Sequence, residues 1–102
     1  MKARFTAPAD SDLEAIGDWI ALDDPLRAVS FVREIRKAAG TLARYPRRNP
    51  ILPGFAPEVR KKVHGQYLIL YRVRERELQI LRVVHGAREL TEILGPLNKS
   101  PS

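Results

Sequence analysis

Apolar residues recur at two different spacings along this chain, and the change falls near its middle. In residues 12–45 they return every three or four positions, which is the spacing of one face of a helix. Leu13, Ile16 and Ile20 form a first stripe. A second and longer stripe contains Ala28, Phe31, Ile35, Ala38, Leu42 and Tyr45. The first half of the chain therefore predicts two amphipathic helices.

Capping residues indicate where these helices begin and end. Pro8 suits the first turn of the earlier helix, because its missing N–H would have no partner there. The motif "DDP" (23–25) both ends that helix and starts the next, with Asp24 as N-cap and Pro25 in the first turn. So short a connection makes the two helices an antiparallel hairpin. The alternating segment "KARFTA" (2–7) predicts a short strand before it.

The second half of the chain alternates with a period of two, which is typical of strands. Four prolines and a glycine make "YPRRNPILPGFAP" (45–57) a loop, whose Ile51, Leu52 and Phe55 need a place to be buried. The turns "GQ" and "RERE" separate three strands: "EVRKKVH" (58–64), "YLILYRV" (67–73) and "LQILRVVH" (78–85). The middle strand is apolar on both faces, as a central strand is. The pattern therefore predicts a three-stranded antiparallel meander.

Beyond Gly86, which ends the last strand, the pattern predicts only a short element. We interpret "ARELTEILG" (87–95) as a short helix or amphipathic tail, and residues 96–102 as a frayed end. The order β-α-α-β-β-β predicts an α+β fold in which the hairpin covers one face of a small antiparallel sheet. The whole chain of 102 residues is expected to form a single domain with one core and no second one. Trp19 and Phe31 are expected in that core, between hairpin and sheet.

Composition narrows the classes of function. The absence of cysteine excludes disulfides, thiolate catalysis and cysteine-based zinc sites. Two histidines and scattered acids show no metal-ligand spacing, and no glycine-rich phosphate loop occurs, so we expect no metal and no cofactor. No apolar run approaches the roughly 18 residues of a membrane span, and the N-terminus lacks a signal-peptide core. We therefore expect a soluble cytoplasmic protein with no membrane partner.

The net charge of +6 is unevenly distributed. Residues 1–24 carry a net charge of −4, residues 25–57 of +6 and residues 58–90 of +4. This asymmetry suggests a basic surface that meets an anionic partner, either nucleic acid or an acidic protein segment. A merely solvated surface is the alternative, and charge alone does not choose between them.

The side chains that could act in catalysis cluster in "ILRVVHGAREL" (80–90), where Arg82, His85 and Arg88 fall within seven positions. RNA cleavage without a metal needs a base, an acid and a cation for the phosphorane charge. Arg60, Arg82 and Arg88 could supply the cation, and His85 could act as base or acid because histidine titrates near neutrality.

Strand alternation does not bring these groups together. It yields two sets, one with Arg82 beside Ile80 and Val84, and the other with His85 beside Leu81 and Val83. Structural roles are equally open. A strand-end histidine such as His85 is more often bonded to backbone, Arg82 could pair with an acid of the tail or of a helix, and Arg60 could belong to a solvated strand end.

Four segments, in their order and spacing, resemble the RelE/ParE superfamily of bacterial toxins from type II toxin–antitoxin operons. They are "DLEAIGDWIALDDPLRAVSFVREI" (12–35), "LARYPRR" (42–48), "VRKKVHGQYLILYRV" (59–73) and "ILRVVHGAREL" (80–90). The resemblance covers nearly the whole chain, from about Phe5 to Leu94. It implies one of two activities: RelE-like members are ribosome-dependent messenger-RNA endonucleases, whereas ParE-like members inhibit DNA gyrase and are not nucleases.

Two positions favour the ParE-like branch. RelE-like nucleases typically have an arginine just after the aromatic residue that opens the middle meander strand, and here Leu68 follows Tyr67. They also have a tyrosine about six residues beyond a basic residue that matches Arg88, and here that position is Leu94. Arg88 itself is common to both branches. The resemblance therefore implies a gyrase inhibitor, with a RelE-like endonuclease as the alternative.

The resemblance also implies partners and their contacts. A cognate antitoxin is expected, typically with a DNA-binding N-terminal part and a segment that folds along the toxin in an apolar groove beside the hairpin. Its contacts are assigned to Trp19, Arg33, Arg36, Arg60 and Arg82. The surface that binds the target, DNA gyrase, is assigned to His85, Arg88, Leu90, Ile93 and Leu94. Under the endonuclease alternative the catalytic groups are Arg60, His85 and Arg88, and only then does the protein bind nucleic acid directly.

Overall fold

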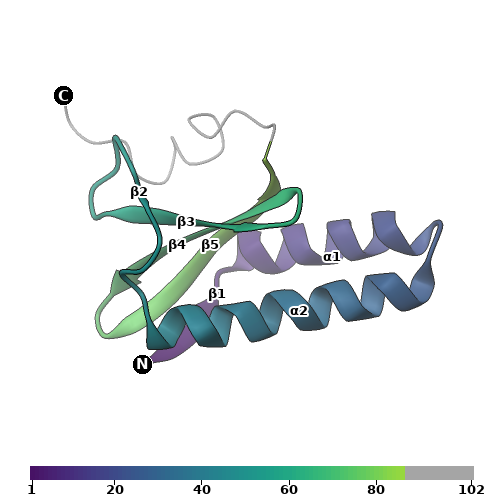
Figure 1. Cartoon of the computed structure of the whole chain (residues 1–102), viewed down its shortest axis with the longest axis horizontal. Coiled ribbons are helices and arrows are strands. Elements are labelled where there is room, and N and C mark those ends of the chain that lie inside the picture. The colour runs from purple at the N-terminus through teal and green to yellow at the C-terminus, as the bar shows by residue number, and fades with distance from the viewer. Residues whose placement is uncertain (87–102) are drawn as a thin grey trace.

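The computed structural model places a helical hairpin on one face of a five-stranded sheet (Figure 1). The structure describes residues 1–86. Its elements are β1 (Lys2–Phe5), α1 (Ala7–Ala21), α2 (Pro25–Arg44), β2 (Ile51–Leu52), β3 (Val59–His64), β4 (Tyr67–Arg74) and β5 (Glu77–His85). The predicted α+β architecture is confirmed, while the predicted tail (87–95) and frayed end (96–102) lie outside the described residues. None of the described helices is long and apolar enough to cross a membrane.

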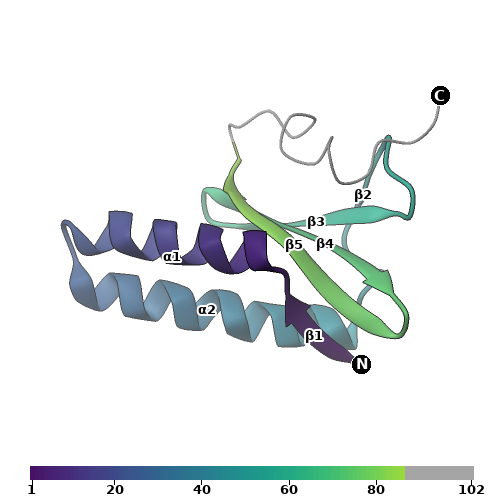
Figure 2. The same ribbon diagram turned by 180° about the vertical axis from the view of Figure 1, so that it is seen from behind.

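The sheet is mixed, whereas the sequence predicted an antiparallel one. Its strand order is β1-β5-β4-β3-β2. The strands β3, β4 and β5 form the predicted antiparallel meander, but β1 lies parallel to β5, with Phe5 opposite Ile80 (Figure 2). Within the segment predicted as a loop, β2 adds a short antiparallel pair in which Leu52 lies opposite Val59. Alternation predicts that a segment is a strand, but it does not reveal which strand it pairs with.

A side-chain cap begins each helix. Thr6 Oγ1 accepts a hydrogen bond from the Ala9 N–H at 3.2 Å, so that α1 begins at Ala7, one residue before Pro8. Asp24 Oδ1 accepts from the N–H of Arg27 at 3.0 Å, and α2 begins at Pro25 as predicted. These caps satisfy N–H groups that have no partner within the helix.

The larger core lies between the hairpin and the sheet. Its buried residues include Leu13, Phe31, Ile35, Ala39, Leu42, Ile69, Tyr71, Leu78, Ile80 and Val83. The burial of Phe31 confirms its predicted place. Ala39, rather than Ala38, continues the buried stripe of α2, because a step of four from Ile35 returns closer to the same face of a 3.6-residue helix. Tyr45, the last residue of the predicted stripe, is half exposed.

Trp19 is not part of this core, so its predicted burial is wrong. The residue is 69% exposed. Figure 1 shows the hairpin extending past the sheet toward its connecting turn. In the last turn of α1, Ile20 continues the stripe of Leu13 and Ile16 and packs against the larger core, whereas Trp19 lies beside that stripe and stays in solvent. A large apolar side chain beside a buried stripe is therefore not necessarily part of the core.

A second, smaller core occupies the other face of the sheet, where the sequence analysis predicted none. It consists of Val59, Leu68, Leu70, Leu81 and Val84. Leu52 and Phe55 of the proline-rich segment pack against it, while Ile51 remains exposed. This core exists because the central strand is apolar on both faces, so that each face must be buried against other apolar residues.

A β-bulge interrupts the pairing of β4 with β5. Tyr71 lies opposite Ile80, but its neighbour Leu70 lies opposite Arg82. Leu81 is therefore an extra residue on β5, with no direct partner on β4. A bulge of this kind leaves the strands paired on both sides but advances one of them by a residue.

The bulge changes which side chains share a face. Ile80 and Val83 both join the larger core, and Leu81 and Val84 both join the smaller one. The predicted sets, Ile80 with Val84 and Leu81 with Val83, are therefore wrong across this segment. Strict alternation holds only for a strand without an inserted residue.

Candidate functional site

Three side chains form a row across the end of the sheet that lies beside the hairpin. His64 of β3 lies opposite Tyr67 of β4, and Tyr67 lies opposite His85 of β5. Both histidines of the chain thus flank one tyrosine. Directly paired residues of antiparallel strands point to the same face. Phe31 of α2 contacts His64 and Tyr67, so the row points toward the helices.

Aromatic contacts hold this row in place. The ring centroid of Phe31 is 5.1 Å from that of Tyr67 and 6.0 Å from that of His64. The rings of Tyr67 and His85 are 5.6 Å apart and meet edge to face at 81°. Such pairs stabilise by about 0.5–1.5 kcal/mol beyond the area they bury. The row is therefore a packed cluster with a defined geometry.

Glu34 of α2 connects the row to a cation. Its Oε1 lies 3.0 Å from His64 Nε2, and its Oε2 accepts from Arg27 Nη1 at 2.5 Å. The hydrogen bond from Arg27, followed by that with His64, lowers the pKa of the Glu34 carboxyl group. Glu34 in turn raises the pKa of Arg27. The carboxylate is thus held in its charged form at neutral pH.

Trp19 and Tyr67 line two depressions. The first, of about 520 Å³, lies between the hairpin and the β3–β4 turn and is lined by residues that include Phe31 and His64. The second, of about 320 Å³, runs between α1 and β5 and is lined by residues that include Val83 and His85. We call the two together the tryptophan groove, defined by Trp19, Phe31, His64, Tyr67, Val83 and His85. It lies beside the hairpin, where the sequence analysis predicted an apolar groove.

An ion pair fixes β5 against α1 at the edge of this groove. Arg82 Nε and Nη2 donate to the two carboxylate oxygens of Asp12 at 2.6 and 2.8 Å. The same carboxylate accepts from the backbone N–H of Val83 at 3.0 Å. The hydrogen bond with Asp12 raises the pKa of Arg82. A helix acid was one of the predicted partners of Arg82, and its guanidinium is occupied inside the protein.

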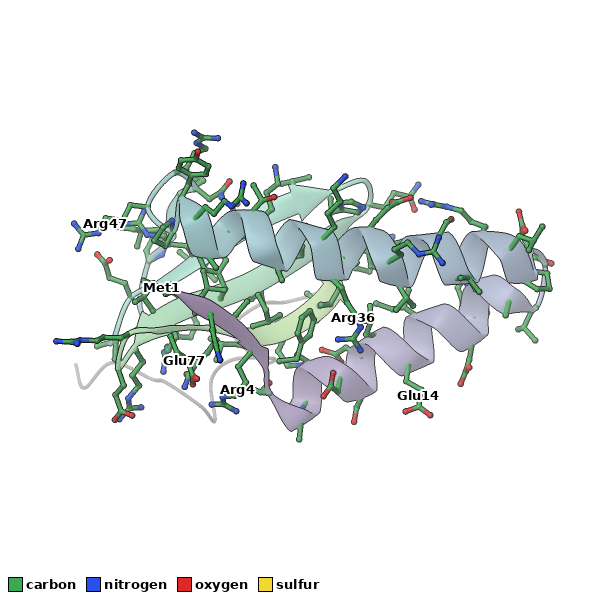
Figure 3. The ribbon with its side chains drawn as sticks, turned by 90° about the horizontal axis from the view of Figure 1, so that it is seen from below. Met1, Arg4, Glu14, Arg36, Arg47 and Glu77 are labelled. Carbon is green, nitrogen blue, oxygen red and sulfur yellow. The ribbon has the colours of Figure 1, made fainter. Side chains whose placement is uncertain are left out.

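The arginines of α2 that were assigned to the antitoxin contact lie away from the groove. Arg33 is exposed on α2. The guanidinium of Arg36 lies 5.0 Å above the ring of Phe5 and 3.7 Å from Asp10, and Figure 3 shows it between the two helices. Of the five residues assigned to that contact, only Trp19 is a wall of the tryptophan groove.

Arg60 is far from His85 in the sheet. Its Nη1 donates to the backbone carbonyls of Asn49 at 2.7 Å and Arg47 at 3.3 Å, which ties the proline-rich segment to β3. Arg60 lies opposite Tyr71, four residues from the row of His85, or about 13 Å along the strands at ~3.3 Å per residue. The structure therefore does not bring these two together. The other residues assigned to the site lie outside the described part of the chain: Arg88, Leu90, Ile93 and Leu94.

Leu68 lies on the face of the sheet opposite to Tyr67. It is buried in the smaller core, across from Val84. A side chain at this position points away from the tryptophan groove. The groove and the position that distinguishes RelE-like nucleases are thus on different faces.

Sequence reasoning missed the contribution of His64, Glu34 and Arg27 to the site. One signal was available, because a two-residue turn at "GQ" requires His64 to lie opposite Tyr67. No such signal existed for the contact of His64 with Glu34, which joins residues 30 positions apart on a helix and a strand. Only the packing of α2 on the sheet brings them together.

Known proteins share both the sequence and the architecture. A family model described as "ParE toxin of type II toxin-antitoxin system, parDE" matches residues 3–90. The chain is 34% identical over 95 residues to "Putative toxin Y4kP" of Sinorhizobium fredii, covering 91% of this chain and 96% of that protein. It is also 34% identical over 84 residues to "Toxin RelE2" of Caulobacter vibrioides, covering 82% and 93%.

A solved structure is similar as well. "Chromosomal ParDE TA system from P. aeruginosa" contains a chain that matches with a TM-score of 0.72 and 27% identity, over 83% of this chain and 95% of that one. The family match begins in β1 and continues past β5, so it includes every described helix and strand apart from Lys2, the first residue of β1. The resemblance to the RelE/ParE superfamily is thereby confirmed. This chain belongs to the ParE toxin family of type II toxin–antitoxin systems.

Proposed function

We propose that this protein inhibits DNA gyrase by protein–protein binding, and that a cognate antitoxin with a DNA-binding N-terminal part neutralises it. Membership of a toxin–antitoxin family implies an antitoxin partner. The identity of the target and the DNA-binding part of the antitoxin are our proposal. No cofactor takes part in this mechanism.

The exposed indole of Trp19 in the tryptophan groove is the observation that carries the proposal. Aromatic side chains are enriched at the centre of protein–protein interfaces. Tryptophan and tyrosine are also enriched where the binding energy of an interface is concentrated. Trp19 and Tyr67 supply both residue types at one place on the surface. We assign the folding segment of the antitoxin to this groove.

The positions of the polar groups also favour a binding protein over a nuclease. Cleavage of RNA needs an acid, a base and a cation that converge on one phosphate. Arg60 lies about 13 Å along the strands from the row of His85 at ~3.3 Å per residue, and its guanidinium binds backbone carbonyls. Leu68 faces the smaller core. The separation of Arg60 from His85 and the orientation of Leu68 count against catalysis by these groups, and in this way they support the binding proposal.

We assign the target contact to the end of β5 and the residues after it: His85, Arg88, Leu90, Ile93 and Leu94. His85 also lines the tryptophan groove. An antitoxin segment in the groove would therefore cover one end of the surface that meets the target. Neutralisation then has a steric cause and needs no change in the fold of the toxin.

Purified gyrase provides the test. The full chain is added to gyrase, ATP and relaxed plasmid, and supercoiling and DNA cleavage are followed on agarose gels. We expect inhibition that increases with toxin concentration and is reversed by the co-expressed antitoxin. Normal supercoiling at a large molar excess of folded toxin would contradict the proposal.

A RelE-like endonuclease is the second candidate, and one comparison favours it. A relative with 34% identity carries the name "Toxin RelE2". Under this alternative, Arg60, His85 and Arg88 are the catalytic groups. Primer extension on cellular transcripts after induction separates the two candidates, because an endonuclease leaves discrete cuts within translated codons, and His85→Ala or Arg88→Ala abolishes them.

A further inference from the structure

A second depression lies on the same side of the sheet, away from the tryptophan groove. It is about 310 Å³ in volume and is bounded by the second half of α2, the loop after it and the edge of the sheet at β3. Ala38, Leu42 and Tyr45 supply apolar surface, and Lys62 projects from β3. We call it the lysine groove, defined by Lys37, Ala38, Leu42, Tyr45, Arg48 and Lys62. Its volume is at the lower end of the ~300–1,000 Å³ of ligand sites, which suits a side chain or two rather than a packed helix.

One wall of the lysine groove is a strand edge that residues 1–86 leave unpaired. In the described chain, β2 pairs only with the start of β3, at Val59 and Arg60. The adjoining backbone N–H of Lys61 donates to the carbonyl of Pro50 at 3.1 Å. Beyond this point Lys62 and Val63 lie on the outer edge of the sheet, and Val63 is 59% exposed. Among the described residues, no strand pairs with this part of the edge.

Three cations surround the apolar floor. Lys37 and Arg48 come from α2 and the loop, and Lys62 comes from β3. Within residues 1–86, no acid lies within ion-pair distance of any of the three. Glu34, the single acid in the lining, is already bound to Arg27 and His64. In the described part of the chain, the groove therefore combines an apolar floor with positive charge at its rim that no acid neutralises.

This combination fits an acidic peptide better than RNA. Tyr45 is the aromatic ring of the groove, and the guanidinium of Arg48 already lies 4.3 Å above it, so one face of the ring is covered. Grooves that bind single-stranded RNA combine positive charge with aromatic faces on which bases stack. Ala38 and Leu42 offer nothing to a phosphate, but they can bury an aliphatic side chain.

We propose that the lysine groove binds an acidic peptide segment, in which one aliphatic side chain enters between Ala38 and Leu42 and flanking carboxylates pair with Lys37, Lys62 and Arg48. We assign this segment to the antitoxin, and only that assignment rests on the proposed function. The segment would occupy a surface separate from the tryptophan groove. Such a partner would hold the toxin at two places, and the effective concentration of each contact would be raised by the other.

The chain offers a matched pair of variants for the test. Lys62 lies opposite Ile69 of the larger core, whereas its neighbour Lys61 lies opposite Leu70 of the smaller core. The two side chains therefore leave β3 on opposite faces. Lys62→Ser and Lys61→Ser remove the same charge from adjacent positions, but only the first removes it from the groove.

Fluorescence anisotropy measures binding to the full chain made by cell-free synthesis. The probe is a fluorescein-labelled peptide of sequence Glu-Glu-Leu-Asp-Glu, compared with one in which serine replaces leucine and one in which glutamine replaces the acids. We expect the serine peptide to bind about tenfold more weakly, because it loses the buried aliphatic group. Lys62→Ser should weaken binding of the first peptide by roughly two- to fivefold, as loss of an exposed ion pair does, and Lys61→Ser by less.

Three results would overturn the proposal. The serine peptide binds as tightly as the leucine peptide, Lys61→Ser weakens binding as much as Lys62→Ser, or a labelled RNA hexamer binds more tightly and depends more strongly on Lys62. Circular dichroism checks that each variant is folded. Because the probes are synthetic, failure here leaves the gyrase assay as an independent test of the proposed function.

Discussion

Tyr67 lies opposite His85 in the β4–β5 ladder, with their ring centroids 5.6 Å apart, only because Leu81 is inserted into β5 as a bulge. The register between the β4–β5 turn and the bulge would carry Tyr67 to Val84 if it continued unchanged. The bulge advances β5 by one residue and turns His85 into the tryptophan groove. A single inserted residue thus decides which side chain forms the end of the candidate site.

Trp19→Ser should weaken binding and neutralisation by the antitoxin while leaving the fold intact. The residue is 69% exposed, so its removal takes little apolar area out of the core. Loss of an anchor at the centre of an interface typically weakens binding by about 2 kcal/mol or more. The measurement is calorimetric titration of toxin with antitoxin, supported by a thermal melt. Leu22→Ser is the control, because Leu22 is 77% exposed but lines neither part of the groove, and equal weakening by both variants would contradict the assignment.

Asp12→Ala should lower the free energy of unfolding by about 2 kcal/mol, because it leaves a partly buried arginine and a backbone N–H without their acceptor. Urea denaturation followed by circular dichroism measures the change. Asp10→Ala in the same helix should have an effect below about 1 kcal/mol, since Asp10 makes an exposed contact with Arg36 at 3.7 Å. A smaller effect at Asp12 than at Asp10 would show that the ion pair between Asp12 and Arg82 does not stabilise the fold.

The stability of the protein should fall in acid partly through Glu34. Hydrogen bonds from Arg27 and with His64 hold its folded-state pKa below the ordinary value of 4.5. A carboxyl group with a lowered pKa contributes stability that is fully present above its unfolded pKa and is lost as the pH falls through the folded one. Glu34→Gln should therefore melt with a smaller pH dependence between pH 6 and about pH 3. A pH dependence unchanged from the parent protein would disprove the contribution of this network.

Arg76→Gly should stabilise the protein by about 1 kcal/mol, because the two-residue turn between β4 and β5 requires left-handed backbone at both positions. Glu75 has φ = 53° and Arg76 has φ = 63°, in a region that favours glycine. The thermal midpoint should rise by roughly 4–8 °C for a chain of this size. Gly65→Ala supplies the opposite test: Gly65 has φ = 60° and open space around it, so the substitution should lower the midpoint through backbone strain alone.

A chain that ends at Gly86 should remain folded and lose its toxicity. Residues 1–86 contain both hydrophobic cores and every described element. Four of the five residues assigned to the target contact follow Gly86, so the shortened chain keeps only His85. Circular dichroism, thermal melting and growth assays on the same shortened chain make the measurement. Unfolding would mean that the removed residues are needed for the fold, and full toxicity would place the target surface elsewhere.

The sequence by itself determined the elements whose signals are local. Helical spacing and the capping residues located the hairpin, with α2 beginning at Pro25. The period of two and the turn residues located the meander, and the apolar run on both faces identified β4 as a central strand. These features depend on residues within one turn or one strand of each other, so the amino-acid sequence alone is sufficient to predict them.

The partners of these elements were decided by the tertiary structure. Phe5 alternates with polar residues whether β1 lies parallel or antiparallel to its neighbour, and only the path of the hairpin places it parallel to β5. Trp19 lies next to the stripe of Leu13, Ile16 and Ile20, but the packing of the hairpin places Ile20 against the core and leaves the indole in solvent. In both cases the deciding contact is with a residue far away in the sequence.

The tertiary structure also decided which side chains form the candidate site. Leu81 is apolar in a run of apolar residues, so nothing in its neighbourhood marks it as the extra residue of a bulge. The bulge satisfies two demands at once, since Leu81 and Val84 fill the smaller core while Ile80 and Val83 fill the larger one. Packing on both faces of the sheet therefore sets the register, and the register turns His85 toward Tyr67, because side chains in a strand can change face only where a residue is inserted.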